Sequence, residues 1–176
     1  MTPNRIITVI VLVAVALYTQ WLSQPDAIHN TPAPTATPRP APDGMLRVSK
    51  VIDGDTIEIE GGAHVRYIGV NTPETVHPTK AVECFGKEAS DYNKKLLEGG
   101  YVRLARDITN TDKYGRLLRY VYLPDGTFVN LKLVTDGYAY ADTYPPDVAH
   151  AKEFVAAQST ARLAVRGLWA SCPVRK

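Results

Sequence analysis

The sequence has little excess charge of either sign. Its 176 residues include 20 Lys and Arg and 18 Asp and Glu, so the formal net charge is only +2. A protein that binds nucleic acid through its overall field would carry a much larger positive charge. Any argument for nucleic-acid binding must therefore rest on local groups of residues. The length suits one compact domain with short additional segments, and no internal repeat is visible.

Cysteine is also scarce, since the chain contains only Cys84 and Cys172. No cluster of His and Cys residues has the spacing of a zinc site, and His64, His77 and His150 have no partners at catalytic spacing. Two cysteines in an exported protein permit a disulfide, which would join the first helix of the domain to the C-terminal tail. We favour this disulfide over the alternative of two unrelated buried thiols.

The first 44 residues differ from the rest of the chain. Arg5 precedes an uninterrupted apolar run over residues 6–18, which is short for a membrane span because a span needs roughly 20 apolar residues. We interpret residues 1–23 as a signal peptide or a membrane anchor, and both alternatives stay open. Residues 24–44 are rich in Pro and Thr without an apolar period, which predicts a disordered linker. The protein is therefore expected to be secreted, or held at the outer face of the membrane.

Residues 45–176 have the pattern of a folded domain. Short β-branched and aromatic runs predict strands over 45–51, 56–60, 64–70, 101–106 and 117–123. Apolar spacing predicts helices over 85–96 and 128–134, the second ended by Gly137. A last helix is predicted to begin after Asp147 as its cap and to carry Val148, Val155 and residues 168–169 along one side. This order predicts an α+β fold, namely an OB-fold barrel of five strands with three helices.

Acidic and amide side chains lie at the predicted turns and strand ends. These residues are Asp53, Asp55, Asn71 and Glu74. Neighbouring strands bring such ends together, and a site built only from oxygen ligands favours a hard cation, either calcium or magnesium. Each motif alone is also compatible with an ordinary turn or loop.

Two basic positions complement these oxygen ligands. Arg66 lies within the third predicted strand and shares a face with Ile68 and Val70. A guanidinium among apolar neighbours is costly unless it meets an anion, although an exposed edge position is an alternative. Lys113 and Arg116 flank Gly115 in a turn and can both reach one anion, unless that turn is simply solvated.

A hard cation, two arginines and an additional carboxylate are what phosphodiester hydrolysis requires. The cation generates or orients a nucleophilic hydroxide, and guanidinium groups donate to the charge that grows on the phosphoryl oxygens. The carboxylate accepts or positions the proton of the attacking water.

Several motifs in order resemble the staphylococcal nuclease-like (thermonuclease) family over roughly residues 46–169. They are VIDGDT (51–56), VRYIGVNTPET (65–75), HP (77–78), GKEAS (86–90) and TDKYGR (111–116). Several motifs in the right order are a much stronger signal than any one of them. The resemblance implies an OB-fold barrel that cleaves DNA and RNA with one calcium ion. It implies attack at phosphorus with the 5′ oxygen leaving, so that the product carries a 3′-phosphate.

The resemblance also implies a role for each matching residue. Arg66, Glu74 and Arg116 match the catalytic residues. Lys113 and Tyr114 match residues that hold a terminal phosphate, and Tyr144 lies near the position of a tyrosine that stacks on the base. Asp55, Asn71, Thr72 through its carbonyl, and Glu74 match the calcium site, with Asp53 in a supporting role.

This sequence departs from the family pattern at Asn71, where the best-known member has a second aspartate ligand. An amide oxygen can still bind calcium, but the lost negative charge predicts weaker binding. Two other functions stay open at this point. The barrel could be a module that binds single-stranded nucleic acid without cutting it, or a structural calcium-binding domain of the cell wall. The protein is expected to act as a monomer, with a preference for single-stranded or flexible substrate.

Overall fold

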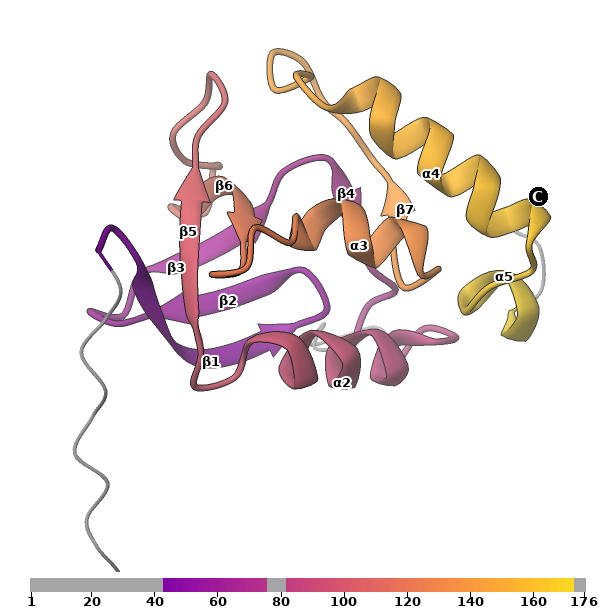
Figure 1. The fold of residues 1–176 in the computed structure, drawn as a ribbon, viewed down its shortest axis with the longest axis horizontal. Helices are drawn as coiled ribbons and strands as arrows, with labels where there is room; N and C mark the ends of the chain where they lie inside the picture. The colour runs from indigo at the N-terminus through magenta and orange to yellow at the C-terminus, as the bar shows by residue number, and fades with distance from the viewer. Residues whose placement is uncertain (1–42, 76–81, 173–176) are drawn as a thin grey trace, which may run out of the picture. The chain divides into compact units, whose positions relative to one another are not determined.

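The computed structural model describes residues 43–75 and 82–172, which belong to one compact unit spanning Arg39–Lys176 (Figure 1). The predicted signal or anchor, nearly all of the predicted linker, and His77 lie outside the described residues. Within the described residues, no helix combines the length and apolar character that crossing a membrane requires.

Five strands close into a barrel in the order β1-β2-β3-β6-β5, and β1 also pairs with β5. The parallel pair is β3 with β6, while the other barrel neighbours are antiparallel. This arrangement confirms the predicted OB-fold, and each of the five predicted strands is present, although the third is shorter than predicted. The strands are β1 (Leu46–Asp53), β2 (Thr56–Ile59), β3 (His64–Tyr67), β5 (Tyr101–Ala105) and β6 (Leu117–Tyr122).

Alternate apolar residues of the strands fill the barrel. Val48, Ile57, Val65, Val102 and Val121 are fully buried, each contributed by a different strand. Because strand side chains alternate between the two faces, one face of each strand supplies the core while the other meets solvent or helices. The turns at which the predicted site residues lie are therefore attached to strands of a packed barrel.

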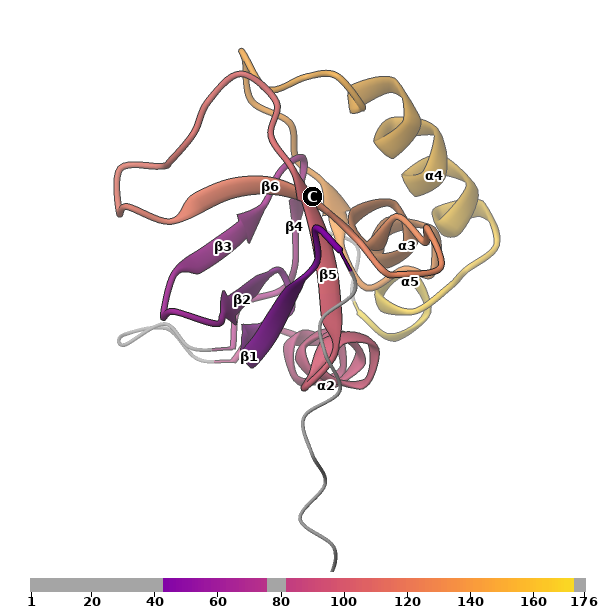
Figure 2. The same ribbon diagram turned by 60° about the vertical axis from the view of Figure 1, so that its left-hand side comes forward.

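In the part of the chain that the structure describes, four helices pack around the barrel, with α2 on one side and α3 beside α4 and α5 on another (Figures 1 and 2). Their bounds are α2 (Gly86–Leu97), α3 (Val129–Thr135), α4 (Ala151–Leu163) and α5 (Leu168–Ser171). A small second sheet pairs β4 (Val70–Asn71) with β7 (Tyr140–Ala141). The predicted third strand therefore divides, because Gly69 takes a φ of +77° and turns the chain out of the barrel.

The predicted last helix is wrong at both ends. Asp147 does not cap it, because its carboxylate accepts hydrogen bonds from the backbone N–H groups of Ile108 and Thr109, 2.9 and 2.8 Å away. The helix α4 begins at Ala151 and ends at Leu163, so Leu168 belongs to a separate helix. Both Val148 and Val155 are exposed instead of packing along a buried side.

The predicted disulfide is confirmed. Cys84 and Cys172 are bonded with an S–S distance of 2.10 Å, although they are 88 residues apart in the sequence. Cys84 lies two residues before α2, and Cys172 directly follows α5. The bond thus attaches the beginning of the first helix to the end of the domain.

We expect Gly137→Ala to lower the free energy of unfolding by about 2 kcal/mol more than Gly126→Ala. Both glycines have positive φ, but an added Cβ at Gly137 would lie 2.4 Å from the Arg166 carbonyl oxygen, whereas nothing lies within 4 Å at Gly126. Urea denaturation of the two variants measures the difference. Equal losses would show that the contact between α3 and the α4–α5 connection is easily displaced.

Candidate active site

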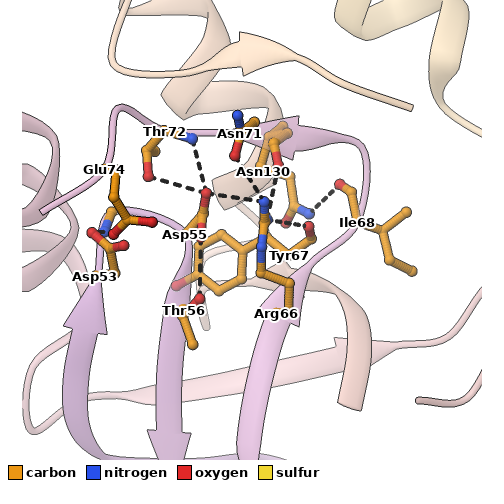
Figure 3. Close-up of polar contacts among 12 residues, drawn as sticks. Asp53, Asp55, Thr56, Arg66, Tyr67, Ile68, Asn71, Thr72, Glu74 and Asn130 are labelled. Carbon is orange, nitrogen blue, oxygen red and sulfur yellow. Dashed lines mark hydrogen bonds and ion pairs between the residues drawn. The ribbon is translucent and has the colours of Figure 1, made fainter. Parts of the chain in front are cut away.

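The candidate site lies where the β1–β2 turn meets the chain leaving β4. Asp53 ends β1 and Asp55 precedes β2, while Arg66 projects from β3. Figure 3 shows the Asp55 side chain between the Glu74 carboxylate and the Arg66 guanidinium. Neighbouring strands therefore gather the carboxylates and the first arginine, as the sequence predicts.

Asp55 is a buried carboxylate with a full set of partners. Only 5% of the residue is exposed. Its Oδ2 accepts hydrogen bonds from the Thr72 backbone N–H at 2.8 Å and the Thr72 hydroxyl at 3.0 Å, and it lies 3.2 Å from Nη2 of Arg66. The hydroxyl of Thr56 donates to Oδ1 at 3.1 Å. A buried charge is tolerated only when it is paired in this way, so Asp55 joins three segments of the chain.

Arg66 is held by acceptors on several sides. Its Nη1 donates to the carbonyl oxygens of Tyr67 and Val70 at 2.9 and 2.8 Å, and its Nη2 donates to Oδ1 of Asn71 at 3.2 Å. The alternative of an exposed edge arginine is wrong, because β3 has a neighbour on both sides and only 17% of this side chain is exposed. The anion that the sequence argument required is the Asp55 carboxylate.

The oxygen donors around Asp55 fit a hard cation. The carboxylates of Asp55 and Glu74, the Asn71 amide and the Thr72 carbonyl are all of the type that calcium prefers. Across residues 43–75 and 82–172, no three Asp, Glu, His or Cys side chains form a group that could hold a metal. A cation at this place would therefore take ligands from amide, carbonyl and water oxygens as well as from carboxylates.

The carboxyl of Asp53 has a raised pKa, chiefly because it is buried. The nearby charges of Asp55 and Glu74 raise the pKa further. Hydrogen bonds from the Thr75 hydroxyl and the Gly54 N–H, both 2.7 Å long, act in the opposite direction. The carboxylates repel one another here, and a bound cation would relieve that repulsion.

Two buried asparagines position these segments, and neither role is predicted from the sequence. The Asn93 amide donates to the Asp53 carbonyl at 2.9 Å and accepts from the Tyr67 hydroxyl at 3.0 Å. Asn130 donates to the Ile68 carbonyl at 2.9 Å and accepts from the backbone of β6. An asparagine within a helical pattern carries no signal of this role, because its partners are distant in the sequence.

The second arginine is held in a similar way by the turn that precedes β6. Arg116 donates through Nε and Nη2 to Oδ2 of Asp112, both at 2.7 Å. The backbone N–H groups of Tyr114 and Arg116 donate to Oδ1 of Asp112, and Gly115 supplies the positive φ that the turn needs. Burial alone would raise the pKa of Asp112, but these hydrogen bonds lower it overall.

A cleft of about 530 Å³ brings both arginines to one surface. Lys113, Tyr114 and Tyr144 also line it, and each tyrosine is 72% exposed. The carboxylates of Asp53, Asp55 and Glu74 do not line this cleft. Three acidic residues that the sequence argument did not place in the site also line the cleft, namely Asp112, Asp142 and Asp147.

Known proteins with similar sequences match most of the folded domain. The family model described as staphylococcal nuclease homologue matches residues 64–171. That match begins at β3, so Asp53 and Asp55 lie just before it. Curated relatives extend the similarity to a larger share of the chain.

The chain is 45% identical over 125 residues to the thermonuclease of Staphylococcus intermedius, a match covering 69% of this chain and 74% of that protein. It is 40% identical over 134 residues to the thermonuclease of Staphylococcus hyicus, covering 74% and 79%. It is 37% identical over 129 residues to endonuclease YncB of Bacillus subtilis (strain 168), covering 70% of this chain and 61% of that protein.

We expect Asp55→Ala to lower the free energy of unfolding by about 3–5 kcal/mol, because it leaves the Arg66 guanidinium and the Thr72 N–H without their buried partner. Urea denaturation in the presence of a chelator measures this structural effect apart from any bound cation. Asp125→Ala, in an exposed turn, is the matched control. A loss no larger than that of the control would show that Asp55 does not hold the site together.

Asp112 should make the domain less stable in acid. Its native pKa lies below its unfolded value of about 4, so its contribution is present above that value and is lost as the pH falls through the native pKa. Asp112→Asn should therefore flatten the decline of unfolding free energy below about pH 4. Denaturation at a series of pH values tests this, with exposed Asp43→Asn as the control; parallel curves for Asp112→Asn and the unaltered protein would contradict it.

Proposed function

Since the chain belongs to the staphylococcal nuclease family and is a nuclease, we propose that it hydrolyses DNA and RNA with one calcium ion. The reaction is attack of water at phosphorus with departure of the 5′ oxygen, which leaves a 3′-phosphate end. The observation that carries this proposal is the position of Arg66. It lines the same cleft as Arg116, and it pairs at 3.2 Å with Asp55, which lies beside Glu74.

The two arginines serve as fixed donors to the phosphoryl group. Nη1 and Nη2 of Arg66 are occupied by protein acceptors, and its Nε has no hydrogen-bond partner among the described residues. In Arg116, Nε and Nη2 bind Asp112. Each guanidinium is thus oriented before substrate arrives, which favours stabilisation of charge that appears only in the transition state.

Glu74 has the role of general base. Its Oε1 accepts a hydrogen bond from the Thr75 N–H at 3.0 Å, and its carboxylate lies beside Asp55 and Asp53 (Figure 3). A carboxylate in this position accepts a proton from the attacking water as the new P–O bond forms.

Asp55, Asn71, Thr72 and Glu74 are the proposed calcium ligands, with Asp53 as a supporting acid. When bound, calcium would lower the pKa of a ligand water and neutralise charge on the phosphoryl group. Asn71 supplies a neutral oxygen where a carboxylate would supply charge, so we propose weaker calcium binding than in a site with two aspartates. The Arg66 bond to the Asn71 amide orients that oxygen.

Lys113, Tyr114 and Tyr144 are the proposed substrate contacts outside the reacting group. Lys113 and Arg116 both lie near the Tyr114 ring, with cation-to-centroid distances of 5.0 and 5.4 Å, so they bring positive charge to the cleft. Tyr144 offers an exposed ring on which an unpaired base can stack. Such stacking favours single-stranded or flexible substrate.

The alternative of a barrel that only binds single strands is not favoured, since the relatives that match most of the domain are thermonucleases. The same matches count against a purely structural calcium-binding domain. We also propose that the protein acts outside the cell as a monomer, and that residues 1–23 either direct export or anchor it to the membrane. The Cys84–Cys172 disulfide supports export, because structural disulfides persist in oxidising compartments.

Denatured DNA and RNA, incubated with the full chain in calcium or in chelator, test the proposal. We expect degradation that requires calcium, and Arg116→Ala should reduce its rate by about 10²–10³ because one transition-state donor is lost. Exposed Arg47→Ala on β1 is the matched control and should cut at the wild-type rate.

Cleavage that continues at full rate in chelator would overturn the calcium dependence. Full activity in Arg116→Ala would remove that residue from the mechanism. End-group analysis of the products distinguishes 3′-phosphate from 5′-phosphate ends, and 5′-phosphate ends would contradict the proposed direction of attack.

A further inference from the structure

Both polar groups of the Glu74 backbone, the N–H and the carbonyl, form a hydrogen bond with the same residue, Glu83. The Glu83 N–H donates to the Glu74 carbonyl at 2.9 Å, and the Glu74 N–H donates to Oε2 of Glu83 at 3.2 Å. Neither residue lies in a helix or strand, so this contact does not come from the regular hydrogen bonding of such an element. Glu83 therefore sets the position of the peptide units that carry the Glu74 side chain.

The segment around Glu83 fits tightly against the same stretch of chain. An added Cβ at Gly86 would lie 2.8 Å from the Glu74 carbonyl oxygen and 3.1 Å from the Pro73 carbonyl oxygen. The Gly86 N–H donates to the Glu83 carbonyl at 3.0 Å, which closes a tight turn at the start of α2. Only a glycine at position 86 permits this approach without displacing Glu74.

Two constraints hold this turn in place. Cys84, directly after Glu83, is covalently bonded to Cys172 at the end of α5. Phe85 takes a φ of +68°, which is unfavourable for a non-glycine residue and persists only where surrounding contacts determine it. Its ring packs on Tyr138, which follows α3, with centroids 5.4 Å apart.

We propose that Glu83 is a positioning residue for the general base Glu74, held in place by the Cys84–Cys172 disulfide. The proposal rests on the proposed function, in which Glu74 accepts the proton of the attacking water. Glu83 touches neither substrate nor calcium in this role. It acts through two hydrogen bonds to the Glu74 backbone, one donated by its own N–H and one accepted by its side-chain Oε2.

A misplaced base should slow the chemical step more than it weakens substrate binding. A shift of about 1 Å in a reacting group costs up to about 10²-fold in rate. The phosphate and base contacts proposed for Lys113, Tyr114 and Tyr144 lie in the cleft, which Glu83 does not line. Loss of the Glu83 carboxylate should therefore lower kcat and leave KM nearly unchanged.

The test compares Glu83→Ala, Glu83→Gln and Glu88→Ala in the full chain with its disulfide intact. We expect Glu83→Ala to lower kcat about tenfold or more with KM nearly constant. Glu83→Gln should recover most of the rate, because its amide oxygen can still accept from the Glu74 N–H. Glu88 is exposed on the first turn of α2 and is the matched acidic control.

Amide hydrogen exchange supplies a readout that needs neither calcium nor substrate. The Glu74 N–H should exchange faster in Glu83→Ala than in the wild type, with the Gln variant between them. Wild-type kcat together with wild-type exchange at Glu74 in Glu83→Ala would overturn the proposal, and so would equal losses of kcat in the Ala and Gln variants.

Failure of the proposed function gives a different result. In that case the wild-type chain itself does not cleave nucleic acid in calcium, whereas the exchange experiment still tests whether Glu83 holds the Glu74 backbone. A general loss of structure in Glu83→Ala would appear as faster exchange throughout the barrel, and the Gln variant then decides by its kcat and its exchange at Glu74.

Discussion

Asp55 carries a negative charge inside the protein, and the groups needed to stabilise that charge determine the architecture around it. Its partners come from β2, β3 and the segment after β4, so one carboxylate holds three parts of the chain at fixed separation. Removing a partner would leave a charge or an N–H unpaired in a region of low polarity. The position of the Arg66 guanidinium therefore follows from electrostatic necessity as much as from the path of the strand.

The two arginines of the cleft share one feature, since a carboxylate fixes the orientation of each guanidinium. Asp55 serves Arg66 through buried contacts, whereas Asp112 serves Arg116 within a single turn stabilised by Gly115. Arginine side chains have many rotamers, so prior fixation reduces the entropy that substrate binding must overcome. The barrel strands orient Arg66 and the turn before β6 orients Arg116, so different local structures fix the two guanidiniums.

The sequence was sufficient for the barrel, the disulfide and the clustering of the acidic turns, because each depends on patterns that are local or on very few residues. It did not reveal Asn93 or Asn130, whose hydrogen bonds connect distant segments. The apolar pattern also predicted a last helix that was too long. The break between α4 and α5 depends on Val165 and Gly167 at positive φ, and on the contact of Gly167 with Gly137 beyond α3, which is a tertiary effect.

The bond between Cys84 and Cys172 encloses α2, all of β5 and β6, and the remaining helices within one covalent ring. A protease that cuts any peptide bond inside this ring produces a nicked molecule whose two pieces stay joined. Under non-reducing conditions the nicked molecule differs from the intact one only by the added water, and it separates into fragments only after reduction. In surroundings rich in proteases, the domain can therefore lose the continuity of its chain without losing any of its parts.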